Sequence, residues 1–449
     1  MKLITAIQSA LLGLANTAPT YGIAVTGGLL LSASGLLSPY LILLCGVIIL
    51  GIFLAGTELN KDYPSYGSAY TWASKVIHPF IGFLTGWFSF SALVLFLVYG
   101  SVYVVTLFFS SVLPKYVLST YASTGIASSI ILIMVITSSL GIKLTARFQN
   151  IFTLVELILL TFFASLIGYD IFTNGIHTTI FPTLSQINTT KISEGFLLAI
   201  FFFWGWEVVF NLSEDSKDKH HTPKKAGYIT LLLLALIYFV YMFAMSLFLS
   251  TDAIALNQEN IFNALNQTIF SEDVSLFVIL GICLSLIGAI DIAIVESSRI
   301  LVAQSRDGLA HQKLSYFSNR FNSPVCSLFV VGGVAITGVI LSSFSDNAKN
   351  IVASGVTVST ILVASYYILM GITGAIHSYK KPLLKTREKL TFIVYPIISV
   401  IIFIVVIVKT FIDFDYSAKS LLMYIILFGI ALYIYFSKFK TPTKYLKLR

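Results

Sequence analysis

The fold of this chain is decided by an interrupted apolar segment near its start, which reads Ala10-Leu-Leu-Gly-Leu-Ala-Asn-Thr-Ala-Pro-Thr-Tyr-Gly22. Pro19 removes a backbone donor and clashes with the carbonyl one turn earlier, so a regular helix is expected to break there. Asn16, Thr17 and Thr20 surround the proline with polar groups. Irregular backbone at membrane depth is tolerated only where it lines a cavity or is buried in protein. The segment therefore predicts a helix broken near mid-membrane, and a simple proline kink is the alternative.

A second interruption is predicted in the segment that reads Ala199-Ile-Phe-Phe-Phe-Trp-Gly-Trp-Glu-Val-Val-Phe-Asn-Leu-Ser-Glu-Asp215. Gly205 stands between two tryptophans and is followed closely by Glu207, which disfavours a continuous helix. A glycine that lets a neighbouring helix approach closely is the alternative. Transporters with inverted repeats place paired broken helices at the substrate site. Because the first and sixth segments are equivalent positions of a five-plus-five repeat, the two interruptions together predict a binding site.

The composition places the chain in a lipid bilayer. Of its 449 residues, 57% are hydrophobic and 11% are charged, and the mean hydropathy is +0.90. A soluble protein carries about 25% charged residues, and a soluble core cannot use this much apolar surface. A transmembrane helix needs about 20 apolar residues. The length therefore fits about a dozen spans and leaves no room for a large soluble domain.

Twelve apolar segments follow one another along the chain, and they predict an all-α membrane protein with twelve transmembrane helices. They cover residues 5–31, 37–59, 80–110, 121–142, 146–169, 193–212, 227–250, 274–303, 324–342, 350–375, 390–408 and 417–436. Residues 1–436 are one transmembrane domain, in which 5–169 and 193–375 are the two repeats and 390–436 adds two helices. Residues 437–449 form a short cytoplasmic basic tail. The first segment lacks a small-residue cleavage site, so it is interpreted as a span and not as a signal peptide.

The placement of positive charge supports this topology. With twelve spans both termini lie on one side, and 23 of the 28 Lys and Arg residues fall there, Arg299 among them. The other side receives Lys115, Lys191, Lys349, Lys409 and Lys419. Because cytoplasmic loops collect Lys and Arg, the split predicts a multi-pass protein of the cytoplasmic membrane with both termini in the cytoplasm.

Several motifs outside the two interruptions lie in loops and at the ends of the apolar segments. The loop after the second segment reads Glu58-Leu-Asn-Lys-Asp-Tyr-Pro-Ser-Tyr-Gly-Ser-Ala-Tyr70 and leads to Gly82-Phe-Leu-Thr-Gly-Trp87. The eighth segment ends in Ser298-Arg-Ile-Leu-Val-Ala-Gln-Ser-Arg-Asp-Gly308, and Asn322-Ser-Pro324 opens the ninth. In order and over most of the chain, these motifs resemble those of the amino acid–polyamine–organocation transporters, and specifically a bacterial amino acid permease branch. The resemblance implies a LeuT-type fold with helices one and six broken, and proton-coupled symport or exchange of amino acids or amines.

The predicted substrate site joins the two interruptions. Amides at the first break would meet a substrate carboxylate, and carbonyls near the second would meet its ammonium group, because exposed helix ends carry fixed partial charges. Phe201 stands where members of the family place an aromatic gate. The predicted substrate-binding residues are Asn16, Thr17, Ala18, Pro19, Thr20, Tyr21, Phe201, Phe202, Phe203, Trp204 and Gly205.

Four acids lie inside predicted spans, where an isolated charge costs a few kcal/mol and usually marks a pathway or a proton site. Glu156 occupies a position that is lysine in several proton-coupled relatives, and we predict a proton-coupling role for it; a neutral, hydrogen-bonded Glu between helices is the alternative. Glu207 is expected either to couple binding to gating or to cap freed amides. Asp291 and Glu296 are possible pathway residues on different faces of one helix. Glu296 could instead pair with Arg299, and no Lys or Arg is expected at mid-span to balance these acids.

Other classes of function are less well supported by the residues. No spacing of His or Cys suggests a metal site, no cofactor is expected, and no nucleophile or base cluster suggests an enzyme. The net charge of +8 is what cytoplasmic loops predict, so nucleic acid is not an expected partner. The expected partners are an amino acid or amine, protons and the bilayer, with the protein a monomer or homodimer. A polyamine transporter and an amino acid sensor on the same fold remain as alternatives.

Overall fold

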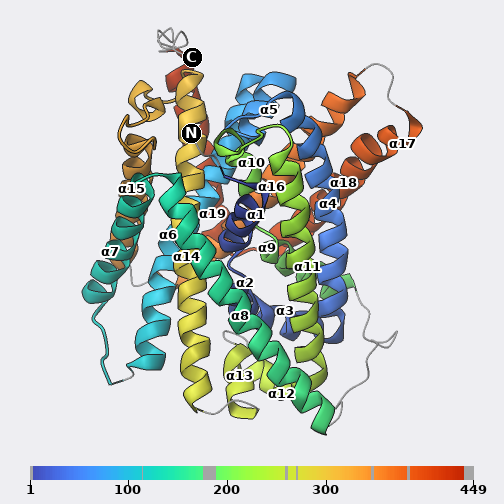
Figure 1. Ribbon diagram of the computed structural model, residues 1–449, viewed down its shortest axis with the longest axis vertical. Helices are drawn as coiled ribbons and strands as arrows, with labels where there is room; N and C mark the ends of the chain where they lie inside the picture. The colour runs from blue at the N-terminus through green and yellow to red at the C-terminus, as the bar shows by residue number, and fades with distance from the viewer. Residues whose placement is uncertain are drawn as a thin grey trace.

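The chain folds into a bundle of long helices that run in roughly the same direction (Figure 1). The computed structural model describes residues 4–113, 115–174, 189–257, 261–268, 272–344, 348–381 and 385–438. Within those ranges the regular structure is helical, apart from one isolated bridge between Ile4 and Ser216. The prediction of an all-α protein is therefore confirmed for the described residues.

The α-helices have the following bounds: α1 Ala6–Thr17, α2 Pro19–Tyr21, α3 Gly27–Ser34, α4 Ser38–Asp62, α5 Ala69–Val76, α6 Pro79–Val112, α7 Thr120–Ser139, α8 Ile142–Asn174, α9 Thr189–Phe202, α10 Val208–Asn211, α11 Thr222–Phe248, α12 Thr251–Leu256, α13 Ile261–Thr268, α14 Glu272–Arg306, α15 Val325–Ser343, α16 Ala348–Tyr379, α17 Thr386–Lys389, α18 Tyr395–Asp413 and α19 Tyr416–Lys438. Two π-helical turns, Gly22–Thr26 and Leu390–Val394, connect α2 to α3 and α17 to α18.

Ten stretches of the described residues are long and apolar enough to cross a membrane, so the chain is a multi-pass integral membrane protein. The first stretch, Ala6–Asp62, has 57 residues and contains Gly35, whose φ of 54° starts a short 3-10 turn between α3 and α4. Helix α9 has 14 residues, fewer than a span needs on its own. Residues 439–449, in the predicted basic tail, lie outside the described ranges.

The boundary between the fourth and fifth segments was predicted at the wrong residues. The sequence analysis placed it between 142 and 146, whereas α7 ends at Ser139 and α8 begins at Ile142. Gly141 turns the chain there with a φ of 110°, which residues with a side chain rarely adopt. A Cβ at this glycine would also lie 2.6 Å from the carbonyl oxygen of Phe321. The turn is hard to detect in the apolar sequence because a single residue makes it.

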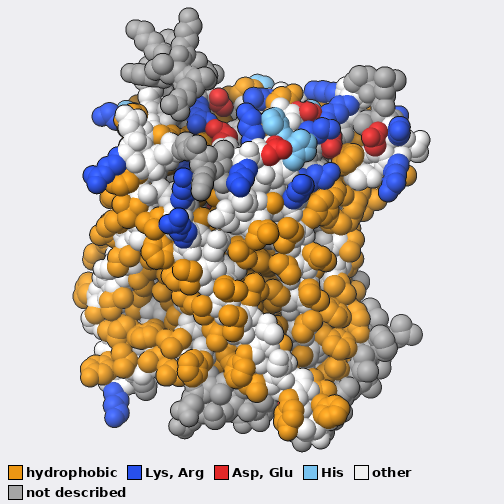
Figure 2. Space-filling model, in the orientation of Figure 1, with side chains coloured by type: hydrophobic (Ala, Val, Ile, Leu, Met, Phe, Trp, Pro, Cys, Tyr) orange, Lys and Arg blue, Asp and Glu red, His pale blue; other side chains and the backbone are white. Residues whose placement is uncertain are grey.

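Burial separates an inner group of helices from an outer one. Within its apolar window α14 is 83% buried, whereas α19 is 11% buried. Helix α1 packs against α8, α10, α11 and α14, so it stands in the interior with the short helices α9 and α10 nearby (Figure 1). The face seen in Figure 2 is a broad hydrophobic band, and Lys and Arg side chains gather at the end near α5, α10 and α17. An apolar outer surface is what a bilayer requires.

A network of ion pairs and aromatic rings joins four parts of the chain at this charged end. Arg299 on α14 is 2% exposed, and its Nη2 lies 3.0 Å from Asp215 Oδ2. The Tyr66 hydroxyl donates to Asp215 Oδ1 over 2.8 Å, and its ring lies under the Arg299 guanidinium. Burial raises the pKa of Tyr66 and the charge of Asp215 adds to the rise, so its hydroxyl stays a neutral donor. Ile4 closes the network by exchanging backbone hydrogen bonds with Asp215 and Lys217.

Candidate functional site

The first predicted interruption is present as a change of backbone conformation at Ala18. Helix α1 ends at Thr17, Ala18 adopts a left-handed conformation with φ 47° and ψ 65°, and α2 begins at Pro19. A left-handed residue is costly for alanine, by about 1–3 kcal/mol, and persists only where the surroundings enforce it. Pro19 favours this arrangement, because the first position of a helix needs no backbone donor.

The second interruption lies directly against the first. Helix α9 ends at Phe202, and residues 203–207 form turns before α10 begins at Val208. Gly205 has a φ of 111°, and a Cβ there would come within 2.8 Å of the carbonyl oxygen of Asn16. Glycine is therefore required at position 205 for two reasons: the positive φ of this residue and the close approach of the α1 backbone. Two segments almost 190 residues apart thus meet at their irregular residues.

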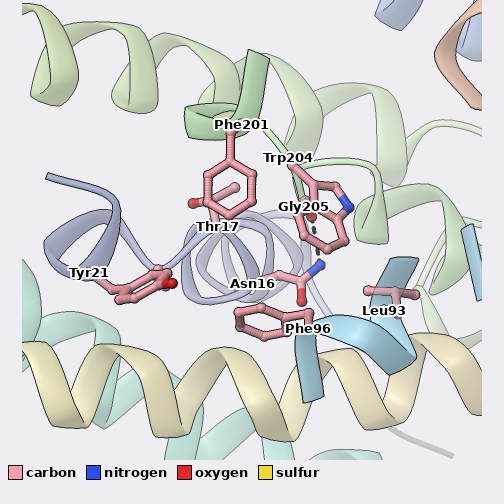
Figure 3. Close-up of a pocket in the computed structure, with 9 residues that line it drawn as sticks. Asn16, Thr17, Tyr21, Leu93, Phe96, Phe201, Trp204 and Gly205 are labelled. Atoms are coloured by element: carbon pink, nitrogen blue, oxygen red, sulfur yellow. Dashed lines mark hydrogen bonds between the residues drawn. The ribbon is translucent and has the colours of Figure 1, made fainter. Parts of the chain in front are cut away.

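A small cavity, with about 20 Å³ of space for the centre of a water-sized sphere, lies where the two interruptions meet (Figure 3). This volume is far below the range of about 300–1,000 Å³ that is usual for small-molecule pockets, so the walls of the cavity must move apart to admit an amino acid. The lining residues come from both interruptions and from α6: Asn16, Thr17, Ala18, Tyr21, Leu93, Phe96, Phe201, Trp204 and Gly205. Most of the wall is apolar or aromatic, and the polar side chains are those of Asn16, Thr17 and Tyr21. The wall thus presents a few polar groups within a largely apolar surface.

Seven of the eleven predicted substrate-binding residues line this cavity, and four lie elsewhere. Phe202 and Phe203 both pack edge-on against the ring of Tyr238 on α11. Pro19 and Thr20 are buried in α2 outside the lining. Residues 201–204 were predicted as a block, but successive residues of a helix end point in different directions, so only Phe201 and Trp204 reach the cavity.

Leu93 and Phe96 complete the lining and were missed by the sequence analysis. They lie three residues apart on α6, a helix that is apolar along most of its length. The ring of Phe96 packs edge-on against Trp204 at 5.8 Å between centroids. Such residues give no signal in the sequence, because aromatic side chains of the core and of a cavity wall have the same composition.

Glu156 binds the start of α2 and does not line the cavity. Its Oε1 accepts the backbone N–H of Thr20 at 2.8 Å and the hydroxyl of Ser285 at 2.5 Å. One of the amides predicted for a substrate carboxylate is therefore already occupied, and Pro19 has no amide to offer. The carboxylate is 3% exposed and joins α8 to α14 and to the first interruption.

Glu207 caps the second interruption. Its Oε2 accepts the backbone N–H of Gly205 at 3.1 Å and the hydroxyl of Tyr367 on α16 at 2.8 Å. This geometry matches the predicted capping of a freed amide. It also connects the irregular residues to α16, which packs against α4 and α6.

Glu296 does not line the cavity, but it is hydrogen-bonded to a residue that does. Its Oε2 accepts from Asn16 Nδ2 at 2.8 Å, and its Oε1 accepts from Asn211 Nδ2 at 2.5 Å. The suggested pairing of Glu296 with Arg299 is wrong, because Arg299 is directed to Asp215 instead. Arg299 is buried, but it balances none of the four acids: no ion pair joins Glu156, Glu207, Asp291 or Glu296 to a Lys, Arg or His among the described residues.

Asp291 is buried away from the cavity, between three helices. Its Oδ1 accepts from Ser138 on α7 and its Oδ2 from Gln149 on α8, at 2.5 and 2.8 Å. Asp291 and Glu296 thus have separate partners, as their spacing of five residues predicted. A structural role in holding α7, α8 and α14 together accounts for these contacts.

A metal centre finds no support in the described part of the chain. No group of three or more His, Cys, Asp or Glu side chains is arranged to hold a metal ion among the described residues. The chemistry available at the cavity is that of hydrogen-bonding amides and aromatic faces. Such groups can form hydrogen bonds and stacking contacts.

Comparison with known proteins identifies one matching family and several relatives. A family model described as amino acid permease matches residues 4–436. The low-affinity putrescine importer PlaP of Escherichia coli is 23% identical over 305 residues, which is 65% of each chain, so the match spans slightly less than two thirds of that relative. The serine/threonine exchanger SteT of Bacillus subtilis is 23% identical over 67% of this chain and 68% of its own. The mouse Asc-type amino acid transporter 1 is 24% identical over 71% of this chain and 61% of its own.

Proposed function

Because this chain belongs to the amino acid permease family, we propose that it is a secondary transporter that moves an amino acid across the cytoplasmic membrane by alternating access. The observation that carries the proposal is the cavity between the two interruptions, whose lining includes Asn16 and Gly205. Inverted-repeat transporters bind substrate where two discontinuous helices meet near the middle of the membrane. The family assignment alone does not locate a site, and the cavity supports a site at its lining residues.

The proposed topology has twelve spans and cytoplasmic termini. A 57-residue helical stretch would be about 85 Å long if straight, and a bilayer core is about 30 Å thick, so Ala6–Asp62 accounts for two crossings. Helices α9 and α10 with the turns between them account for another crossing. Together with the nine remaining stretches this makes twelve. The charged end seen in Figure 2 would face the cytoplasm.

The lining favours an amino acid with an uncharged side chain. None of the described lining residues is acidic or basic. A second cationic group, as in a diamine, would enter this apolar wall without an opposite charge, which is costly in a low-dielectric site. The relationship to a putrescine importer keeps an organic amine as the second candidate. For such a substrate the nearest acids would be Glu296 and Glu207, because each accepts a hydrogen bond from a residue that lines the cavity.

Coupling to protons is proposed to involve Glu156 and Glu207. Both are buried carboxyl groups without a salt bridge to Lys, Arg or His among the described residues. A carboxyl group that is desolvated and has no cation partner can exchange its proton near neutral pH. Each group also contacts an interrupted helix, so a change of its charge would act on the segments that must move.

Uptake into proteoliposomes tests this function. Purified protein would be reconstituted and supplied with radiolabelled L-serine, L-leucine, L-phenylalanine or putrescine, with and without an inward proton gradient. The proposal expects saturable uptake of at least one of the amino acids, competed by the unlabelled compound. Uptake of putrescine alone would establish the second candidate. The absence of saturable uptake of all four, also against internal substrate for exchange, would refute transport of this class.

A further inference from the structure

Both amide protons of Asn16 are already engaged. Its Nδ2 donates to the backbone carbonyl of Gly205 over 2.9 Å and to Glu296 Oε2 over 2.8 Å. A carbonyl oxygen only accepts, so the nitrogen end of the amide must face Gly205. In Figure 3 the nitrogen of Asn16 points to Gly205 and its oxygen points to the other side. The orientation of this side chain is thus determined by its two acceptors.

The remaining atom, Asn16 Oδ1, has no hydrogen-bond partner among the described residues although it is buried. Asn16 is only 8% exposed, and it lines the cavity. Leaving a buried polar atom unsatisfied costs about 1–3 kcal/mol, so such an atom needs an explanation. An acceptor held by two contacts and facing an apolar cavity is suited to a donor that arrives with a ligand.

We propose that Asn16 Oδ1 accepts a hydrogen bond from the amino group of the substrate, and that Glu296 is the positioning residue that holds it for this contact. The inference rests on the proposed transport function and names the atom that would recognise the amine. It gives this contact to a side chain, whereas the sequence pattern predicts carbonyls near the second interruption. An ammonium group has three N–H donors, and the aromatic faces of Phe96 and Trp204 in the same lining favour a cation.

Glu296 is suited to positioning because it is held firmly and does not touch the cavity. It is fully buried, lies outside the lining and is fixed from the opposite side by Asn211. Asn211 Oδ1 is likewise buried and has no hydrogen-bond partner among the described residues. Asn211 therefore contacts Glu296 through its side-chain nitrogen. If Glu296 acts as a hydrogen-bond acceptor, glutamine can replace it, because its amide oxygen can still accept from Asn16 and its amide nitrogen can donate to Asn211 Oδ1 once the Asn211 amide turns round.

The test compares amino acids with the same acids lacking the amino group. Equilibrium binding to purified protein would be measured for three pairs: L-alanine and propionate, L-leucine and 4-methylpentanoate, and L-phenylalanine and 3-phenylpropionate. The ratio of the two dissociation constants in a pair is the amine discrimination. In the unaltered protein we expect about ten- to a hundredfold discrimination for the pair that binds, as for one hydrogen bond to a charged group. If no amino acid binds, the proposed function fails together with this inference.

Four variants separate the possible outcomes. Asn16→Ala and Glu296→Met should each lose most of the discrimination, the double variant should lose no more than either alone, and Glu296→Gln should retain it. Asp291→Asn, a change of a buried acid on the same helix, should leave the ratio unchanged. Discrimination that survives Asn16→Ala overturns the assignment of Oδ1, and this variant decides the matter even if Glu296→Met fails to fold. Equal loss in Glu296→Gln and Glu296→Met overturns positioning by a hydrogen bond.

Discussion

The backbone N–H of Thr20 donates a hydrogen bond to Glu156 Oε1 over 2.8 Å, so a side chain of α8 holds the first residues of α2. The same oxygen accepts from Ser285 on α14. Three segments therefore meet at one carboxyl group, beside the interruption and behind the cavity wall. A group in this position can act on the start of α2 without contacting the ligand.

Replacing Glu156 by Gln tests its part in proton coupling. The amide keeps an oxygen for Thr20 and Ser285 but cannot gain or lose a proton in the physiological range. We expect folded protein whose substrate uptake no longer changes with external pH, measured as initial rates in proteoliposomes. Glu194→Gln, the same change at an exposed residue of α9, should behave like the unaltered protein. An unchanged pH profile in Glu156→Gln would remove this residue from the coupling role.

Gly205→Ala should abolish most transport. Alanine at a φ of 111° costs about 1–3 kcal/mol in strain, and its Cβ would press on the carbonyl of Asn16 at 2.8 Å. Uptake and thermal stability would be measured together, so that misfolding is recognised. Gly125→Ala on α7, where an added Cβ meets nothing within 4 Å, is the matched control. Normal uptake in Gly205→Ala would show that the contact between the two interruptions is not needed.

Removing Asp215 should destabilise the charged end strongly. Asp215→Asn leaves Arg299 buried without its counter-ion, a change that typically costs about 3–5 kcal/mol. Glu214→Gln alters the neighbouring ion pair with Arg306, whose side chains are 25–40% exposed, and should cost about 1 kcal/mol or less. Thermal unfolding of both variants in detergent provides the comparison. Equal shifts in melting temperature would contradict the expectation that the buried ion pair contributes more to stability than the partly exposed one.

Phe96→Leu should widen the range of accepted substrates. The ring of Phe96 closes one wall of the cavity and packs against Trp204, so its loss enlarges the space. Larger uncharged amino acids should then compete better for uptake, relative to L-serine, than they do in the unaltered protein. Phe88→Leu, on the same helix but outside the lining, should leave the order of preference unchanged. The same order in both variants would argue against this wall as a determinant of size.

Labelling of single cysteines tests the topology. In protein whose Cys45, Cys283 and Cys326 are replaced, a cysteine would be introduced at exposed Tyr116 or exposed Lys224. A maleimide that cannot cross membranes should label the first variant in intact cells and the second only after lysis. The reverse pattern would place the termini outside, against the proposed orientation.

The sequence by itself determined that this is a helical membrane protein and that two of its helical segments are interrupted at identifiable positions. Composition decides the first point, because only a bilayer tolerates so much apolar surface. Pro19 and Gly205 decide the second, because proline and glycine change the backbone locally, whatever the remainder of the chain does. The four acids could also be found, since a charge in an apolar segment is rare.

Only the tertiary structure decided what those residues contact. The choice of Phe201 and Trp204 over Phe202 and Phe203, and the contribution of Leu93 and Phe96, depend on how helices are rotated against one another. The partners of Glu156 and Glu296 come from segments 85 to 280 residues away. Periodicity describes one helix at a time, whereas a hydrogen bond between helices depends on the packing of both. For this reason the sequence predicted where the chain is interrupted, and the packing determined which end of the Asn16 amide is engaged and which is left without a partner among the described residues.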